Sequence, residues 1–217
     1  YSEAQRNDWR RENVNTLIRE LKRTILLTKP WVRFGISPFG IYRNKKSTAD
    51  GSGSNTNGLQ NYDDLYADIT YWVQQGWIDY NIPQIYWEIG HPAADYITLI
   101  KWWDKNANGG HLYIGQDVAR TMKAEQLTRK MRYERALPHV SGNCFWPANE
   151  ILWNNKGVAD SLKRNYHRYP ALIPAYTHMH NRPPKDVSKL KTEWTPKGFL
   201  LHWQAEQSPT NPELASY

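Results

Sequence analysis

The sequence has a single cysteine, Cys144, among its 217 residues. One cysteine can form neither an internal disulfide bond nor a metal site built from several thiolates. Because Phe145 and Trp146 follow it, we expect Cys144 to be a small buried apolar residue. The sequence also lacks any apolar run near the roughly 20 residues that a membrane-spanning helix needs. The mean hydropathy of -0.79 agrees with this and excludes a bundle of membrane helices.

Several motifs of phosphate and acyl chemistry are missing as well. No GxGxxG or GxxxxGKS/T loop follows a predicted strand, and no GxSxG elbow is present, which excludes the ordinary esterase arrangement. The net charge of +7 favours anionic partners. The Lys and Arg residues are nevertheless scattered and form no dense tract or known nucleic-acid motif. A nucleic-acid-binding domain therefore stays only as a third alternative.

The sequence does contain an excess of polar aromatic residues, with 11 Trp and 14 Tyr beside 4 Phe. Such side chains pack through the ring while their N–H or O–H group reaches a polar partner. They suit grooves that hold the apolar faces of sugar rings, and they equally suit a large aromatic core. Composition alone leaves both interpretations open.

Helical and strand patterns alternate along the chain. The predicted helices cover about residues 8–27, 61–75, 92–107, 123–136 and 158–166. We expect strand segments to be neighbours in one parallel sheet at residues 32–36, 82–86, 112–115 and 143–146. This α/β order is typical of parallel βα units, and four such units amount to about half of an eight-stranded TIM barrel. A doubly wound sheet is the rival interpretation.

Polar and aromatic side chains gather where these strands end. In parallel α/β folds, ligands meet the carboxyl ends of the strands. Two carboxylates at these positions, Glu88 and Asp117, are candidate catalytic residues. The candidate substrate-binding residues are Tyr42, Arg43, Gln84, Tyr86, Trp87, His91, Gln116 and Trp146. Aromatic, amide and carboxylate groups together resemble a sugar site more than a phosphate or metal site.

Glu88 is the most informative of these residues. Its neighbour Trp87 is an apolar group of the kind that raises the pKa of a carboxyl towards the range of a general acid. Alternate residues of an extended chain point to one side, so we expect one cleft to be lined by Gln84, Tyr86, Glu88, Asp117 and Trp146. The alternatives are that Glu88 is an exposed charge before a helix and that Asp117 is a helix cap.

No metal or cofactor is expected. His178 and His180 could share one face of a strand, but no acidic or sulfur ligand flanks them at the usual spacing, so a loop pair is the better interpretation. Asp79 begins its strand on the face opposite the candidate site. Residues 44–58 are rich in Gly, Ser and Asn, which predicts a mobile loop that no packed core holds and only a ligand orders.

Five stretches of the sequence carry a resemblance to a known family. They are WRRENVN (9–15), FGISPFGIYRN (34–44), YADITYWVQQGWIDYNIPQIYWEIGH (66–91), LYIGQ (112–116) and YPALIPAY (169–176). Together they span nearly the whole chain, and ISPFG with PQIYW is a specific combination. In sequence and order they resemble the bacterial glycosyl-hydrolase-like TIM-barrel family of extracytoplasmic glycosidases.

The resemblance implies a domain organisation and a location. Residues 1–168 would form the C-terminal half of a glycosidase-like (β/α)8 barrel, and residues 169–217 would lead toward a β-sandwich module of the fibronectin-III type. An aspartate-rich strand end of the family would lie just before Tyr1, so at least one candidate catalytic carboxylate is expected outside this chain. The implied location is extracytoplasmic: periplasmic, lipoprotein or secreted.

The resemblance also implies a function. We expect a glycoside hydrolase that cleaves a bacterial or complex glycan by carboxylate general acid/base catalysis. Its implied partner is a glycan substrate, derived from peptidoglycan or otherwise anionic, which suits the positive net charge. The alternative is a non-catalytic glycan-binding barrel, which the same aromatic side chains would serve. A nucleic-acid binder would instead reveal itself by a steep salt dependence.

Overall fold

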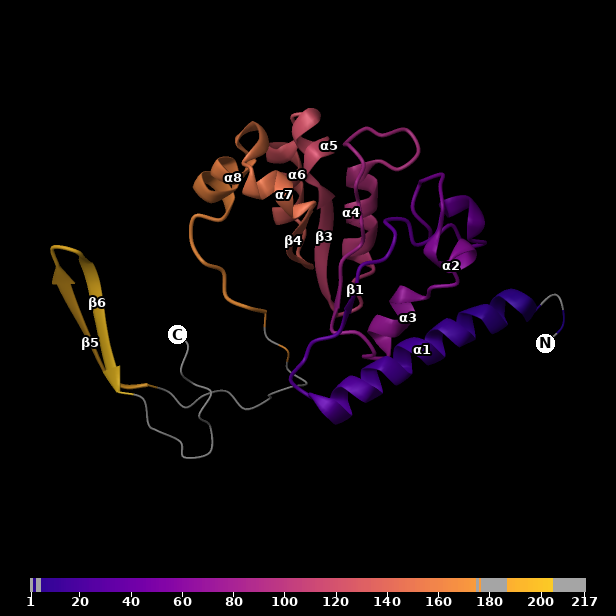
Figure 1. Cartoon of the computed structure of the whole chain (residues 1–217), viewed down its shortest axis with the longest axis horizontal. Helices are drawn as coiled ribbons and strands as arrows, with labels where there is room; N and C mark the ends of the chain where they lie inside the picture. Colours follow the sequence, from indigo (N-terminus) through magenta and orange to yellow (C-terminus); the bar gives the residue numbers. More distant parts are fainter. Residues whose placement is uncertain (1, 3–4, 175, 177–186, 205–217) are drawn as a thin grey trace. The chain divides into compact units, whose positions relative to one another are not determined.

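The protein divides into two compact units, residues 1–175 and 176–217. The computed structural model describes residues 2, 5–174, 176 and 187–204. The first unit holds a four-stranded sheet with its helices, and the second holds a two-stranded hairpin (Figure 1). Each unit is described by itself below.

The sheet of the first unit is entirely parallel. Its strands are β1 (Gly35–Ile36), β2 (Tyr80–Asn81), β3 (His111–Asp117) and β4 (Val140–Trp146), in the spatial order β1-β2-β3-β4. Each strand pairs with its neighbour in sequence, and helices alternate with the strands. The prediction of four neighbouring parallel strands is confirmed, and the arrangement is that of a partial α/β barrel.

The regular ladder of β2, Tyr80–Asn81, lies just before the predicted strand at residues 82–86. Pro83 has no N–H group to donate and interrupts the ladder. Pairing resumes at Gln84, which bridges Phe39 on one side and Gly115 on the other. The main-chain N–H of Gly115 donates to the Pro83 carbonyl at 3.0 Å, so the two strands remain close beyond the proline.

The helices connect the strands and cover one face of the sheet. They are α1 (Arg6–Thr28), α2 (Asn61–Asp64), α3 (Ile69–Gln74), α4 (Tyr96–Lys105), α5 (Val118–Lys123), α6 (Leu127–Arg135), α7 (Ala148–Leu152) and α8 (Val158–Ser161). Short 3-10 turns lie at Lys45–Ser47 and Asn155–Gly157, and a π-helical turn at Leu162–Tyr166 follows α8.

Two of the predicted helices differ from the observed ones. The pattern over residues 61–75 is divided into α2 and α3, because Tyr66 adopts a positive φ of 56° and Asp68 begins a new helix by accepting the Tyr71 N–H at 3.2 Å. The helix predicted at 123–136 begins at Leu127 and follows the separate α5. Local turns and caps therefore divide what hydrophobic periodicity joins.

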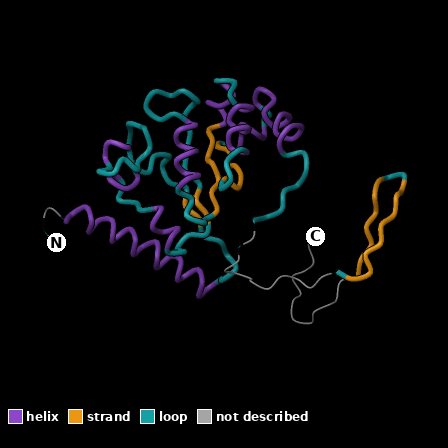
Figure 2. The backbone as a smooth tube through the Cα atoms, turned by 180° about the vertical axis from the view of Figure 1, so that it is seen from behind, coloured by secondary structure: helices purple, strands orange, loops and turns teal. Residues whose placement is uncertain are grey.

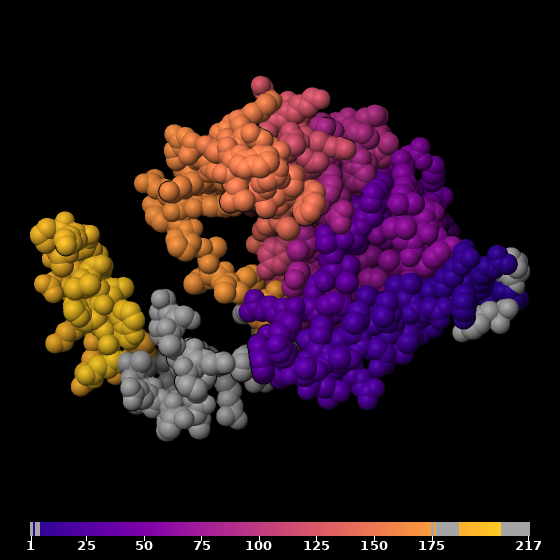
Figure 3. Space-filling model, viewed as in Figure 1, coloured from indigo at the N-terminus to yellow at the C-terminus, as the bar shows by residue number. Residues whose placement is uncertain are grey.

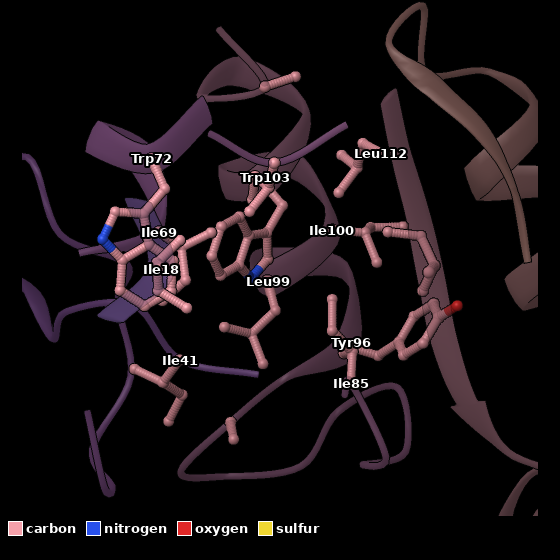
Figure 4. Close-up of a cluster of buried hydrophobic side chains, with 14 residues drawn as sticks. Ile18, Ile41, Ile69, Trp72, Ile85, Tyr96, Leu99, Ile100, Trp103 and Leu112 are labelled. Atoms are coloured by element: carbon pink, nitrogen blue, oxygen red, sulfur yellow. The ribbon is translucent and has the colours of Figure 1, made fainter. Parts of the chain in front are cut away.

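The largest apolar core lies between the helices and the sheet. Side chains of α3, α4, β3 and the connecting segments converge there (Figure 4). The inner face of α4 consists of Tyr96, Leu99, Ile100 and Trp103, which are all buried. Burying each such side chain contributes about 1.5–3 kcal/mol. A smaller cluster joins α5, α6 and α8 through Val118, Leu127, Met131, Val158 and Leu162.

Helix α1 is attached to this unit by buried polar contacts. The Lys22 ammonium donates to Asp79 Oδ1 at 2.7 Å, and the two side chains are 7% and 1% exposed. Asp79 Oδ2 also accepts the main-chain N–H of Phe34 at 2.6 Å. The same helix accepts the indole N–H of Trp72 through Asn15 Oδ1 at 2.7 Å. Asp79 thus links α1 to the amino ends of β1 and β2, consistent with its predicted structural role.

The loop at residues 44–58 is organised around a buried side chain, so the prediction of an unpacked loop is wrong. Asn44 accepts the Thr56 hydroxyl at 2.9 Å and donates to the Gly58 carbonyl at 2.8 Å. Trp102 on α4 donates to the Ser52 carbonyl at 2.7 Å. Much of the first unit is loop (Figure 2), and this loop is fixed by hydrogen bonds rather than by apolar residues.

A buried polar network crosses the layer between β3 and α6. Glu134 is 2% exposed and accepts hydrogen bonds at Oε1 from the Tyr96 hydroxyl and, at 2.8 Å, from Gln116 Nε2. Gln116 Nε2 also donates to Asn143 Oδ1 at 2.5 Å. Glu134 Oε2 has no hydrogen-bond partner among the described residues. Burial raises the pKa of Glu134 to about 8, so the carboxyl is mainly protonated at neutral pH.

The second unit contains an antiparallel pair, β5 (Ser188–Thr195) and β6 (Gly198–Gln204). This hairpin lies within residues 169–217, which the resemblance assigns to a segment that leads toward a β-sandwich module. The β-sandwich to which this hairpin would belong stays a prediction.

The buried ion pair of α1 predicts a large loss of stability. Lys22→Met removes the ammonium that pairs with the buried Asp79 carboxylate, so we expect the free energy of unfolding to fall by about 3–5 kcal/mol. Arg23→Met is the matched control, because Arg23 is exposed beside Glu20 and should change stability by about 0.5 kcal/mol or less. Urea denaturation of the whole protein that contains this chain measures both. Equal effects of the two changes would contradict a structural role for the buried pair.

The buried Glu134 predicts a pH dependence of stability. Its folded-state pKa of about 8 exceeds the ordinary 4.5, so its contribution is complete below about pH 4.5 and is lost as pH rises through about 8. Glu134→Gln stays neutral, so we expect the variant to gain stability relative to the wild type across that window.

Denaturation at a series of pH values measures this gain. Glu125→Gln, in the exposed turn before α6, should leave the pH dependence unchanged. A constant difference in the free energy of unfolding between wild type and Glu134→Gln from pH 4 to 9 would show that folding does not shift the pKa of Glu134, and would contradict this account.

Candidate active site

The two faces of the sheet differ in chemistry. On β3, Leu112, Ile114 and Gln116 are buried against the helices, and the alternate residues point to the other face. Parallel pairing places Gly115 beside Cys144 and Asp117 beside Trp146, so these side chains share that other face. Cys144 is exposed, and the expectation that it is buried is wrong, because the pleat of β4 turns it away from the helix layer.

The open face therefore carries the polar and aromatic ends of the strands. Gln84 points to this face and donates from Nε2 to the Ser37 carbonyl at 3.0 Å. Trp146 at the end of β4 is 60% exposed. Tyr86 is half-buried. Its pKa is raised by burial first and then by the negative charges of Cys144 and Asp117, so its hydroxyl lies within electrostatic range of both.

Asp117 ends β3 and begins α5. Its Oδ1 accepts the Arg120 N–H at 2.8 Å, which makes it the N-cap of α5, and its Oδ2 lies 3.4 Å from Arg120 Nε. The cap that the sequence offers as an alternative is therefore real. It leaves the carboxyl group half-buried on the open face, beside the Arg120 guanidinium.

Glu88 follows β2 in the turn that leads to α4. Its main-chain carbonyl accepts the N–H groups of His91 at 3.2 Å and Tyr96 at 3.4 Å. The side chain is half-buried, and among the described residues no hydrogen bond or ion pair to its carboxyl group is found. This carboxyl is available for a ligand or a proton.

A buried lysine lies close to both carboxylates. Lys130 on α6 is 0% exposed. Burial lowers its pKa to about 8, and the nearby charges of Glu88 and Asp117 act in the opposite direction. Glu88 and Asp117 are thus within electrostatic range of one ammonium group. They come from two strand ends that are 29 residues apart along the chain.

Lys130 is not among the residues predicted from the sequence, because it lies in a helix and not at a strand end and is counted only among the scattered basic residues. A signal for it exists in the pattern of α6. The buried positions of that helix are Leu127, Lys130, Met131 and Glu134, which follow helical spacing. Two charged residues on the apolar stripe of a helix point to a buried polar function.

Trp87 and His91 lie beside Glu88. The Trp87 ring meets Phe39 edge-on at a centroid distance of 5.4 Å and lies 6.3 Å from the His91 ring. His91 Nδ1 accepts the N–H groups of Ala93 and Ala94 at 3.3 and 3.2 Å, so this nitrogen is unprotonated and stabilises the turn before α4. The remaining ring nitrogen is the one that can meet a ligand.

Three of the predicted substrate-binding residues are engaged elsewhere. Gln116 is 0% exposed on the helix face, in the Glu134 network. Tyr42 donates to Asp68 at 2.7 Å, and its pKa is raised chiefly by burial. Arg43 forms a bidentate pair with Asp63 at 2.8 Å for each bond. These contacts hold the fold together, and we leave the three residues out of the proposed site.

A groove lies apart from the carboxylates. It has a volume of about 480 Å³ and opens between α6, β4 and residues 166–171, beside the segment coloured orange in Figure 3. Glu134, Arg135, Asn143 and Tyr166 are among its lining residues, whereas Glu88 and Asp117 are not. That Glu88 lines a cleft stays a prediction.

Among the residues that the structure describes, no three His, Cys, Asp or Glu side chains are grouped to hold a metal ion. His178 and His180 lie outside those residues. In the same part of the chain, no helix has the length and apolar character needed to cross a bilayer.

Comparison with known proteins identifies relatives of this fold and site. Residues 2–132 match the family model described as glycosyl hydrolase-like 10. The chain is 40% identical over 216 residues to glycosyl hydrolase YngK of Bacillus subtilis, an alignment that covers 94% of this chain and 42% of the relative. It is 39% identical over 158 residues to glycosyl hydrolase DigH of Escherichia coli K12, covering 66% of this chain and 36% of the relative.

The chain thus spans about two fifths of the length of the curated relatives that it matches. The family match covers β1, β2 and β3 with the two candidate carboxylates, Glu88 and Asp117. On the family model and the identity to these relatives, the chain belongs to the glycosyl hydrolase-like 10 family.

Proposed function

We propose that the protein containing this chain is a glycoside hydrolase, with Glu88 and Asp117 as the carboxyl groups that this chain contributes to catalysis. One observation carries the proposal: the two carboxylates, from adjacent strand ends, lie within electrostatic range of one buried ammonium. Glycoside hydrolysis usually needs a pair of carboxyl groups at the scissile bond, one protonated and one ionised. The relatives named glycosyl hydrolase support the same reaction class.

The surroundings of the two groups suggest different roles. Asp117 accepts a main-chain N–H and pairs with Arg120, contacts that stabilise a carboxylate. Asp117 therefore suits the ionised partner. Glu88 has no such contact among the described residues, so its proton can be exchanged with the glycosidic oxygen. Glu88 is the proposed general acid. In a family member with an acidic strand end before this region, that strand end would add further carboxylates to the site.

The substrate class follows from the open face. Tyr86, Trp87 and Trp146 provide rings that can pack against sugar faces, while Gln84 and Asp117 provide hydrogen-bonding groups. The net charge of +7 favours an anionic glycan. We therefore propose a glycan derived from peptidoglycan, and with it an extracytoplasmic location, where such a substrate is found.

Digestion of purified peptidoglycan glycan strands by the full-length protein, with mass analysis of the products, tests this function. Shortened oligosaccharides are the expected result. Strands that are bound but not shortened would identify a non-catalytic glycan-binding barrel. Binding of duplex DNA with a steep loss of affinity on adding salt would instead identify a nucleic-acid-binding domain.

The role of Glu88 predicts the effect of a nearly isosteric change. Glu88→Gln keeps the size and hydrogen-bonding capacity of the side chain and removes its proton chemistry. We expect turnover by the full-length protein to fall at least about a hundredfold while the protein still folds. Glu20→Gln, on the exposed side of α1, is the matched control and should retain wild-type turnover.

Asp117 allows a second variant with an intact fold. Asparagine caps helices as well as aspartate does, so Asp117→Asn preserves the start of α5 and removes the charge. It should lose turnover as Glu88→Gln does. Wild-type turnover in either variant would remove that residue from the catalytic pair.

A further inference from the structure

Lys130 occupies a position where a lysine is costly. Its side chain is 0% exposed, and a buried ammonium destabilises a protein unless hydrogen bonds and opposite charges compensate it. Its neighbours on the inner stripe of α6, Leu127 and Met131, are apolar and offer no compensation. The compensating groups must therefore come from other elements.

Two hydrogen bonds and one aromatic ring surround the ammonium. Lys130 Nζ donates to the Trp87 carbonyl at 2.9 Å and to Thr121 Oγ1 at 3.0 Å. It also lies 4.2 Å from the centroid of the Tyr96 ring, a favourable distance for a cation–π contact. Trp87 immediately precedes Glu88, and Thr121 lies in α5, the helix that Asp117 caps. One ammonium therefore joins the two segments that carry the carboxylates.

The charges facing Lys130 identify its counterions. Glu134 is four residues further along α6, but burial raises its pKa to about 8, so it is mainly neutral at neutral pH. Tyr96 from α4 contributes an uncharged ring. From the β2–α4 turn and the end of β3, the charges that act on Lys130 are those of Glu88 and Asp117. With a pKa of about 8, Lys130 itself is mostly protonated at neutral pH.

We propose that Lys130 is the positioning residue of the Glu88–Asp117 site: its buried ammonium fixes the main chain before Glu88 to α5 after Asp117 and supplies the positive charge that both carboxyl groups face. The consequence for turnover rests on the proposed glycosidase function. The electrostatic link between the three side chains does not, and it can be measured separately.

Carbon-13 NMR of the carboxyl groups measures that link in the full-length protein. Samples labelled at the Asp and Glu carboxyl carbons are titrated with acid and base, and Glu88→Gln and Asp117→Asn assign the two signals. In the wild type, both signals should show a second inflection near pH 8, where Lys130 loses its proton. Absence of that inflection in both signals would overturn the proposal, and this test needs no variant of Lys130.

Lys130→Met provides the complementary measurement, because methionine has similar length and no charge. The inflection near pH 8 in the Glu88 and Asp117 carboxyl signals should shrink when the titrating ammonium is removed. Lys123→Met is the matched control on exposed α5 surface and should leave both unchanged. A folded Lys130→Met protein with wild-type carboxyl titrations would contradict the proposal.

The pH profile of turnover separates positioning from simple structural support. Turnover by the wild type should decline above about pH 8, and Lys130→Arg, which keeps its charge, should move that decline to higher pH. An unchanged alkaline limb would contradict the role of Lys130. If the full-length protein cleaves no glycan while the carboxyl titrations respond to Lys130→Met, the proposed function fails and the assignment of Lys130 stands.

Discussion

Close parallel pairing of β2, β3 and β4 is the constraint on which the candidate site depends. A side chain at position 115 could not be accommodated, because its Cβ atom would lie 2.9 Å from the Pro83 carbonyl. Glycine at this position lets β2 and β3 approach, and the register of β3 with β4 then places Asp117 beside Trp146. The carboxyl ends of the three strands therefore meet at one edge. Because these strand ends meet, Glu88 and Asp117 lie within electrostatic range of the same Lys130 ammonium.

The two faces of the sheet have different roles: the helix face stabilises the fold, and the open face carries the candidate site. The helix face buries large apolar side chains, and the polar groups on it are held by specific partners: Lys22 by Asp79, and Gln116 by Glu134. The open face carries carboxylate, amide and aromatic groups with few mutual bonds. Helix α6 connects the faces, since its Lys130 extends from the buried layer to the strand ends. A glycosidase needs this combination of rigid support and available polar groups.

Local patterns in the sequence predict much of this fold. Helical spacing identifies the inner face of α4, and the alternation of helices with strands predicts the parallel order. The alternation of residues along a strand also predicts which face of the sheet each side chain points to, and the choice of candidate residues by strand end alone ignores this. Gln116 lies two residues after Ile114, on the apolar side of β3, and this spacing indicates burial rather than ligand contact. Cys144 likewise alternates with the helix-facing Asn143.

Other features depend on contacts between distant segments, which no local pattern encodes. The compensation of Lys130 comes from residues 43 and 9 positions away in sequence. The conformation of the 44–58 loop depends on hydrogen bonds of Asn44 and of Trp102 on α4, which its Gly and Ser content does not reveal. The protonated state of Glu134 follows from burial that only the packing of α6 on β3 creates. Candidate catalytic residues can be named from strand ends, whereas their electrostatic support cannot.

A structure of the full-length Glu88→Gln variant with a bound peptidoglycan oligosaccharide tests the central claim most directly. The account predicts that a glycosidic oxygen lies within about 3 Å of the residue 88 side chain, with Asp117 next to the same sugar on the open face of the sheet. A glycan bound instead in the groove between α6, β4 and residues 166–171, away from both residues, would contradict it.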